Sequence, residues 1–310
     1  MKIAKICYLE KEEEIELPRW TRFLTQNMRK KYILSKKPFR IYEKDDVLYG
    51  VLSFEGGQGL PQPWREKAEN MMKALAAEGA GIAITPYEGE VPNNILPLAH
   101  GRVLTSLFAF EGAAEALRRQ GRNPEEARFV IAGNERKVLD LVLAGMGDYV
   151  NHLSFFVDDT EEVEDIQEQL FVEKGLRSEA FSSPKNLLFA EADVVIVCGM
   201  DQVGYEHILK RYAVYVDASG NRPSLRRLAQ RRWDVVATEG FYFKMEKQQF
   251  DQREAEAIAF TRYMEFRRFW LEHLTKEAAT EIFSMLKEQS FAVSGFFAFG
   301  NRVKIAKNQG

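Results

Sequence analysis

The stretch Arg128-Phe-Val-Ile-Ala-Gly133, together with the repeat that follows it, decides the fold class of this 310-residue chain. It is a short run of apolar and β-branched residues that ends in glycine, which is typical of a strand and a turn. Residues 135–150 then carry apolar side chains every three or four positions, at Val138, Leu139, Val142, Leu143 and Met146. This pattern predicts a strand, a turn and a helix.

The same strand-and-helix unit recurs along the chain. Leu153–Asp158 is a second predicted strand, Thr160 is a suitable N-cap, and an acidic helix is expected to end at Gly175. Further strands are expected at 178–181, 192–198, 212–217 and 233–238, with a short helix from Pro184 after the first of them. Apolar strands that alternate with helices favour a doubly wound parallel sheet, because right-handed crossovers cover both of its faces.

The first hundred residues show an α/β pattern of their own. A hairpin is expected over 39–54 around the polar turn 43–46, followed by a helix over 63–77. The proline- and asparagine-rich segment 86–97 is the expected linker. We therefore expect a smaller N-terminal α/β substrate lobe (1–100), the doubly wound domain (101–243), and C-terminal helices with a terminal strand packed between lobes or subunits (244–310).

Composition excludes several classes of protein. Hydrophobic residues make up 45% and charged residues 29% of the chain, which excludes a disordered or low-complexity protein. The net charge of −3 gives no overall attraction to nucleic acid or to an anionic membrane, and no apolar run approaches the roughly 20 residues that cross a bilayer. Two cysteines and four separate histidines indicate neither a disulfide framework nor a metal site. With no secretion signal at Met1, a cytoplasmic location is expected.

Three segments in series resemble one known family. They are Ala113–Gly121 leading into Phe129–Gly133, then Glu191–Gly199, then Leu209–Arg222. Their pattern resembles the NAD(P)-binding domain of the shikimate dehydrogenase and methylene-tetrahydrofolate dehydrogenase type, over about 100–240. The resemblance implies a Rossmann-like domain behind a substrate lobe, a ligand cleft between lobes, NAD or NADP as cofactor, and final helices that return to the N-terminal lobe.

The turn after the first strand departs from the glycine pattern of that family. A dinucleotide site is typically G-x-G-x-x-G, whereas Gly133–Val138 keeps only the first glycine. Glu135 stands where the diphosphate should lie, and two unit charges about 4 Å apart repel by roughly 4 kcal/mol at an effective dielectric near 20. The helix N-terminus returns only about 0.3–1 kcal/mol. Unless Arg136 and Lys137 neutralise Glu135, a scaffold turn or an altered anion site is favoured over a conventional NAD(P) site.

Loops after the strands supply the other candidate contacts, because open α/β sheets bind ligands beyond the carboxyl ends of their strands. The candidate cofactor contacts are Gly133, Asn134, Asp158, Gly199 and Asn221. Asp158 suits a ribose hydroxyl, although an aspartate is also an ordinary residue at a strand end. Asp201 and Arg222 are candidate ligand contacts, as is Gly57 in the glycine-rich turn of the N-terminal lobe. Plain loops are the alternative for each of them.

Other signals have an ordinary structural interpretation. Tyr32 and Lys36 have the Y-x-x-x-K spacing by which methylene-tetrahydrofolate dehydrogenases activate their substrate, but a solvated helix end is favoured, because one such pair is expected by chance. Cys198 is interpreted as a core residue, since no histidine near it in sequence would activate the thiol. The five arginines of 222–232 are interpreted as a solvated helix face with Leu225 and Leu228 buried, not as a nucleic-acid site.

Three function classes remain open on the sequence, and none has identified catalytic residues. The first is a Rossmann-like protein of dehydrogenase ancestry that binds a small metabolite or nucleotide without catalysis. The second is an NAD(P)-dependent oxidoreductase. A third class is an interaction protein, since the aromatic residues of 260–270 and 291–299 favour a homodimer interface.

Overall fold

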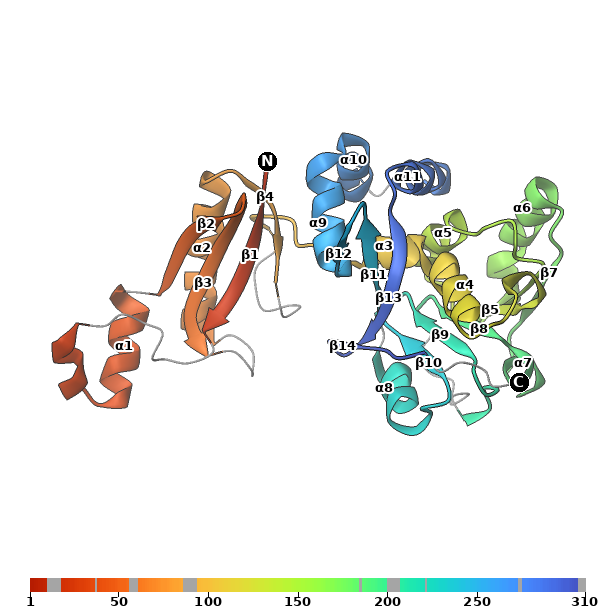
Figure 1. Ribbon diagram of the computed structural model, residues 1–310, viewed down its shortest axis with the longest axis horizontal. Coiled ribbons are helices and arrows are strands. Elements are labelled where there is room, and N and C mark those ends of the chain that lie inside the picture. Colours follow the sequence, from red (N-terminus) through yellow and green to blue (C-terminus); the bar gives the residue numbers. More distant parts are fainter. Residues whose placement is uncertain are drawn as a thin grey trace. The chain divides into compact units, whose positions relative to one another are not determined.

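The chain is described by a computed structural model over residues 1–9, 18–36, 38–55, 61–85, 94–183, 186–199, 207–220, 222–272 and 275–305. Its contacts divide it into two units, coloured by sequence in Figure 1. Unit 1 consists of Met1–His100 with Glu256–Arg267, and unit 2 of Gly101–Ala255 with Arg268–Gly310. Within the described ranges, no helix is long and apolar enough to cross a membrane.

Unit 1 contains a four-stranded sheet in the order β2-β3-β1-β4. The strands are β1 (Lys2–Leu9), β2 (Phe39–Lys44), β3 (Val47–Glu55) and β4 (Ala80–Ile84). The predicted hairpin is confirmed, because β2 and β3 pair antiparallel around Asp45 and Asp46, whose φ angles of 52° and 60° suit short acidic side chains in a tight turn. The helices are η2 (Arg19–Phe23), α1 (Gln26–Lys36) and α2 (Gln62–Ala77). The buried side chains of α2 are Ala68, Met71, Met72 and Leu75.

Unit 2 is built on a six-stranded sheet in the order β10-β9-β8-β5-β6-β7, in which every pair of neighbours is parallel. The strands are β5 (Arg128–Ala132), β6 (His152–Phe156), β7 (Ser178–Phe181), β8 (Val194–Val197), β9 (Val214–Asp217) and β10 (Val236–Thr238). Counted along the chain, the spatial order is 3-2-1-4-5-6, the doubly wound order of Rossmann-like folds. The predicted α/β fold class is confirmed. The apolar runs explain it, because β8 and β9 are buried along their whole length.

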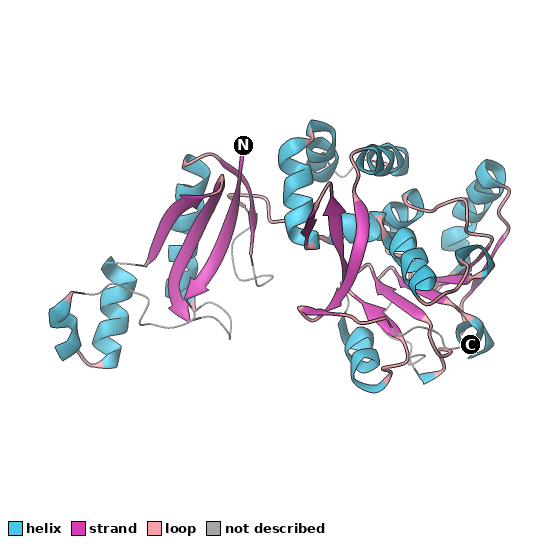
Figure 2. Ribbon diagram, viewed as in Figure 1, coloured by secondary structure: helices cyan, strands magenta, loops and turns pink. Residues whose placement is uncertain are grey.

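Helices flank both faces of this sheet (Figures 1 and 2). They are α3 (Arg102–Leu107), α4 (Ala109–Arg119), α5 (Arg136–Ala144), α6 (Glu164–Lys174), α7 (Asn186–Glu191) and α8 (Arg222–Arg231), with the short turns η3 (Pro124–Glu126) and η4 (Thr160–Val163). Right-handed crossovers place α5 and α6 on one face and α7 and α8 on the other. The helical segment from Arg102 to Arg119 is interrupted at Phe108, which divides it into α3 and α4.

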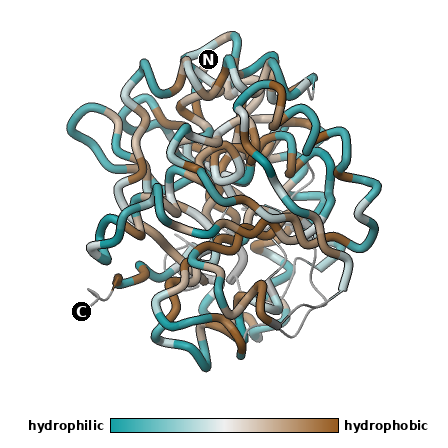
Figure 3. The backbone as a smooth tube through the Cα atoms, turned by 90° about the vertical axis from the view of Figure 1, so that its right-hand side faces the viewer, coloured by the Kyte–Doolittle hydropathy of each residue, from teal (hydrophilic) through white to brown (hydrophobic). Residues whose placement is uncertain are grey.

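The core of unit 2 on the α7 and α8 face is apolar, and Figure 3 colours the hydrophobic segments of the chain brown and the hydrophilic ones teal. Val195 and Val197 of β8 pack here with Leu225 and Leu228 of α8. The prediction that the two leucines form the buried side of this helix is confirmed. Exposed arginines such as Arg226 lie on the outer side of α8.

A second sheet of unit 2 was not indicated by the sequence. Its strands pair antiparallel in the order β12-β11-β13-β14. They are β11 (Gly240–Met245), β12 (Gln248–Phe250), β13 (Ala292–Ala298) and β14 (Asn301–Arg302). The terminal strand therefore belongs to a sheet of unit 2, together with the hairpin that starts at Gly240.

Three helices connect β12 to β13, namely α9 (Gln252–Arg262), α10 (Met264–Glu272) and α11 (Lys276–Glu288). The aromatic residues expected at a homodimer interface are largely buried within one chain: Phe266, Phe291 and Phe296 are at most 1% exposed. The aromatic pattern thus reflects packing inside the chain. The homodimer stays a prediction without that support.

Candidate functional site

The topological switch point of the six-stranded sheet lies between β5 and β8, where the chain order reverses direction. The loops after β5, β8 and β9 leave the sheet at this edge. We call residues Gly133–Glu135, Cys198–Gly199 and Asp217–Gly220 the carboxyl-edge site. Open α/β sheets bind ligands at this position.

The turn between β5 and α5 is held by backbone hydrogen bonds to neighbouring strands. The Gly133 N–H donates to the Phe156 carbonyl over 2.8 Å, and the Glu135 N–H donates to the Cys198 carbonyl over 3.0 Å. These bonds use two of the N–H groups that a turn of this kind offers to a phosphate. The turn is therefore fixed to the sheet, and these two N–H groups are not available to bind an anion.

The Glu135 side chain lies against Gly199 across the switch point. A Cβ atom added to Gly199 would stand 2.7 Å from the Glu135 Cβ and 3.1 Å from its Oε2. Gly199 also has a φ of 99°, a backbone conformation that favours glycine. The close contact with Glu135 and the positive φ thus both require glycine at position 199, where β8 leaves the sheet. The absence of a side chain there leaves room for the Glu135 carboxylate.

Cys198 and Asp217 form the buried floor of the site. Burial raises the pKa of the Cys198 thiol above its ordinary value, and the Glu135 and Asp217 carboxylates raise it further. Asp217 is 1% exposed, and its Oδ1 accepts hydrogen bonds from the Ser219 hydroxyl (3.0 Å) and the Gly220 N–H (2.9 Å). The thiol is therefore protonated at neutral pH and fully buried, as its interpretation as a core residue requires.

Arg102 brings a cation to the edge of the site. A Cβ atom on Gly220 would lie 3.1 Å from the Arg102 Nε, so the exposed guanidinium lies close to the loop after β9. The Ser106 hydroxyl donates to the Ala218 carbonyl over 3.4 Å, which places α3 beside this loop. Arg102 is not predictable as a site residue from the sequence, because no local signal links α3 to a loop more than a hundred residues further along the chain.

The residues expected on the β6 side have different surroundings. The Asn134 side-chain amide donates to the Glu162 carboxylate on η4. Asp159 caps η4 by accepting a hydrogen bond from the Glu161 N–H over 3.0 Å. Asp158 therefore has no capping role in η4, and its carboxylate is exposed just beyond the end of β6.

Several expected contacts have no described side chain. Three of them lie outside the described residues, namely Gly57, Asp201 and Asn221. Arg222 begins α8, and only its backbone is described. Among the residues that the structure covers, no three histidine, cysteine, aspartate or glutamate side chains are grouped as a metal site would require.

A dinucleotide diphosphate does not fit these residues. Glu135 occupies the α5 terminus, and Arg136 does not neutralise it, because its guanidinium pairs with Asp140 (3.1 Å) and Asp165 (2.9 Å). An exposed carboxylate, Asp158, also lies at the neighbouring strand end. The site favours ligand groups that donate hydrogen bonds over groups that carry negative charge.

Comparison with known proteins gives no family for this chain. No protein-family model matches it, and no curated protein matches it. Among solved structures, L-tryptophan dehydrogenase from Nostoc punctiforme is similar at 11% identity and a TM-score of 0.35, over 93% of this chain and 89% of that one. Shikimate dehydrogenase from Mycobacterium tuberculosis is similar at 14% identity and a TM-score of 0.34, over 92% of this chain and 100% of that one.

The similar structures also include a different class of enzyme. A putative aspartate carbamoyltransferase from Trypanosoma cruzi is similar at 10% identity and a TM-score of 0.31, over 70% of each chain. At such low scores these likenesses decide neither family nor activity. The strand order and the carboxyl-edge site therefore carry the functional argument.

Proposed function

We propose that unit 2 is a Rossmann-like ligand-binding domain that recognises a small polar metabolite or nucleoside at the carboxyl-edge site, without the catalysis of a nicotinamide-dependent dehydrogenase. One observation carries the proposal. The Glu135 N–H is bonded to the Cys198 carbonyl, and the Glu135 side chain lies against Gly199. The position that a diphosphate requires is thus occupied by a carboxylate.

The chemistry of the site favours a ligand with hydroxyl or amino groups. The Glu135 and Asp158 carboxylates only accept hydrogen bonds when ionised, so each favours a donor on the ligand. Asp158 has the place in the fold from which an acidic residue bonds ribose hydroxyls. A nucleoside without phosphates combines these requirements.

A series of adenine compounds tests the proposal. Adenosine, AMP and ADP carry the same nucleoside with increasing phosphate charge, and we expect the affinity to fall along these three. NAD⁺ carries the nucleoside on a diphosphate diester, and we expect it to bind less tightly than adenosine. Isothermal titration measures the affinities. Thermal shift supports them, since a ligand at a hundred times its dissociation constant stabilises the folded state by about 2.7 kcal/mol. Absence of binding by adenosine and AMP would overturn the proposed nucleoside specificity.

An NAD(P)-dependent oxidoreductase is the alternative function. The 3-2-1-4-5-6 strand order and the position of Asp158 favour it, and Arg102 offers a cation near the same edge. This alternative requires NAD(H) or NADP(H) to bind more tightly than adenosine. That outcome in the same titrations would replace the first proposal with the second.

A further inference from the structure

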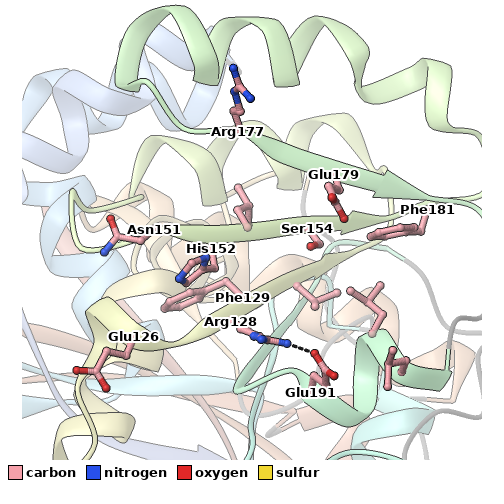
Figure 4. A pocket seen from close by; sticks show the side chains of 14 residues that line it. Glu126, Arg128, Phe129, Asn151, His152, Ser154, Arg177, Glu179, Phe181 and Glu191 are labelled. Atoms are coloured by element: carbon pink, nitrogen blue, oxygen red, sulfur yellow. Dashed lines mark ion pairs between the residues drawn. The ribbon is translucent and has the colours of Figure 1, made fainter.

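A pocket of about 720 Å³ lies on the α7 face of the six-stranded sheet, at the amino halves of the strands (Figure 4). Parallel sheets are normally covered by helices on both faces. Here α7 has only six residues, a length of about 9 Å at 1.5 Å per residue. Its Phe189 packs on Phe156 at the end of β6, with ring centroids 5.0 Å apart. The beginnings of β6 and β7 therefore remain uncovered on this face.

The floor of the pocket is polar. Ser154 of β6 is paired with Glu179 of β7, so the two side chains share a face, and His152 lies two residues earlier on that face. Figure 4 shows all three side chains at the pocket. A sheet face covered by a helix would carry apolar residues at these positions. Polar residues thus occur where helical cover is missing.

One wall of the pocket is apolar. Leu187 and Leu188 of α7 and Phe181 of β7 line it, and Leu187 is 69% exposed. An exposed leucine beside a polar floor gives the pocket an amphipathic lining. Pockets of this volume are within the usual range for small-molecule sites.

The charges around the pocket leave a carboxylate facing it. Arg128 pairs with Glu191 across its rim, so that these two charges offset each other. Arg177 also lines the pocket, and its guanidinium lies 5.6 Å from the centre of the Phe171 ring of α6 (Figure 4). Neither arginine neutralises the Glu179 carboxylate.

We propose that this pocket binds a cationic amphipathic molecule. Its ammonium group faces Glu179 and Ser154, and its apolar body packs on Phe181, Leu187 and Leu188. None of the residues that line this pocket belongs to the carboxyl-edge site, so the proposal does not depend on the function proposed above. An amine with an apolar body matches both the negative charge of Glu179 and the apolar wall of the pocket.

The test uses two small probes that differ in charge. 2-Phenylethylamine carries an ammonium group, and 3-phenylpropionate carries a carboxylate on a similar aromatic body. We expect the amine to bind the full chain at millimolar concentration and at least about tenfold more tightly than the acid, since the ammonium group forms a hydrogen-bonded ion pair with Glu179 whereas a carboxylate is repelled by it. Two-dimensional NMR titration measures both affinities and identifies the residues affected.

Two variants locate the site. We expect Glu179→Gln to weaken amine binding by about tenfold, because it removes the charge and keeps the size. Leu187→Ser is expected to weaken it as well, since it removes the exposed part of the wall. Glu168→Gln on α6 is the matched control and should leave the affinity unchanged, because this residue does not line the pocket.

Three results would overturn the proposal. They are failure of the amine to bind, equal affinity for the amine and the acid, and an unchanged amine affinity in a folded Glu179→Gln variant. A circular dichroism melt of each variant separates loss of binding from loss of folding. Adenosine binding in the same samples reports on the carboxyl-edge site separately.

Discussion

The two ends of the six-stranded sheet hold their loops by different means. At the carboxyl edge, the turn after β5 is fixed by the N–H groups of Gly133 and Glu135, which donate to carbonyls of neighbouring strands. At the amino edge, the Asp193 carboxylate accepts from the Arg128 N–H over 2.9 Å and pairs through its other oxygen with Arg122 and Lys210. The backbone bonds at the turn after β5 leave the Glu135 carboxylate exposed for a ligand, whereas the Asp193 carboxylate at the amino edge holds three segments of chain together.

The energetic consequences differ in the same way. Asp193 is 5% exposed and serves three groups, so removing its charge leaves two partly exposed cations without their partner. At the carboxyl edge, the critical feature is the space and backbone conformation of Gly199. The amino edge is therefore expected to be sensitive to charge, and the carboxyl edge to be sensitive to volume.

The largest loss of stability is expected from Asp193→Asn. Loss of the carboxylate leaves Arg122 and Lys210 facing each other, and we expect it to cost about 3 kcal/mol of unfolding free energy, the lower end of the range for a buried ion pair, because both cations are partly exposed. Urea denaturation of the full chain measures this loss of unfolding free energy. Glu191→Gln is the control at the same edge, because its pair with Arg128 is exposed and contributes about 0–1 kcal/mol. Equal losses in the two variants would contradict the central role of Asp193.

The next largest loss of stability is expected from Gly199→Ala. The new Cβ would stand 2.7 Å from the Glu135 Cβ at a φ of 99°, and such strain costs about 1–3 kcal/mol. Gly121→Ala is the matched control, since Gly121 has a φ of 79° and no atom within 4 Å of an added Cβ. The difference between the unfolding free energies lost in Gly199→Ala and in Gly121→Ala measures the cost of the contact with Glu135. If the control lost as much stability, backbone conformation alone would account for the effect.

A smaller effect is expected on ligand binding from Glu135→Gly. Removal of the carboxylate should raise the affinity for NAD⁺ by about tenfold, or about 1.4 kcal/mol. Glu135→Gln keeps the size and removes the charge, so it should give most of the gain if repulsion is the obstacle. Titration calorimetry measures both variants. No gain in either would show that the diphosphate position lies elsewhere.

The smallest effect is a dependence of stability on pH at the amino edge. Burial, together with the Arg122 and Arg128 guanidinium groups, lowers the pKa of Lys210 from 10.5 to about 8. Between these two values the unfolded chain binds more protons than the folded chain, so the unfolding free energy should rise with pH. Below about pH 8 both states carry the Lys210 proton, so this contribution to the pH dependence levels off.

Lys210→Met provides the reference for this pH dependence. Urea midpoints of both proteins at about pH 7 and about pH 10 isolate the contribution of Lys210, because the other titrating groups are shared. The wild type should gain more stability on alkalinisation than the variant. Parallel pH profiles would mean that Lys210 keeps its ordinary pKa in the folded chain.

The sequence by itself determined the elements that depend on neighbours within a few residues. Apolar runs such as Val194–Val197 predicted buried strands, and two aspartates fixed the tight turn at 45–46. The sequence also predicted a negative charge at the diphosphate position, because Glu135 lies in the same turn as Gly133. Right-handed crossovers then limited the sheet to a doubly wound arrangement.

Only the tertiary structure decided which distant segments meet. The pairing of β11 with β13, the approach of Arg102 to Gly220, and the three-way contact of Asp193 each join residues far apart in the chain. The uncovered face beside α7 likewise becomes visible only once β6 and β7 are placed on one side of the sheet. Local patterns fix backbone conformation, whereas these contacts follow from how whole elements bury their surfaces against each other.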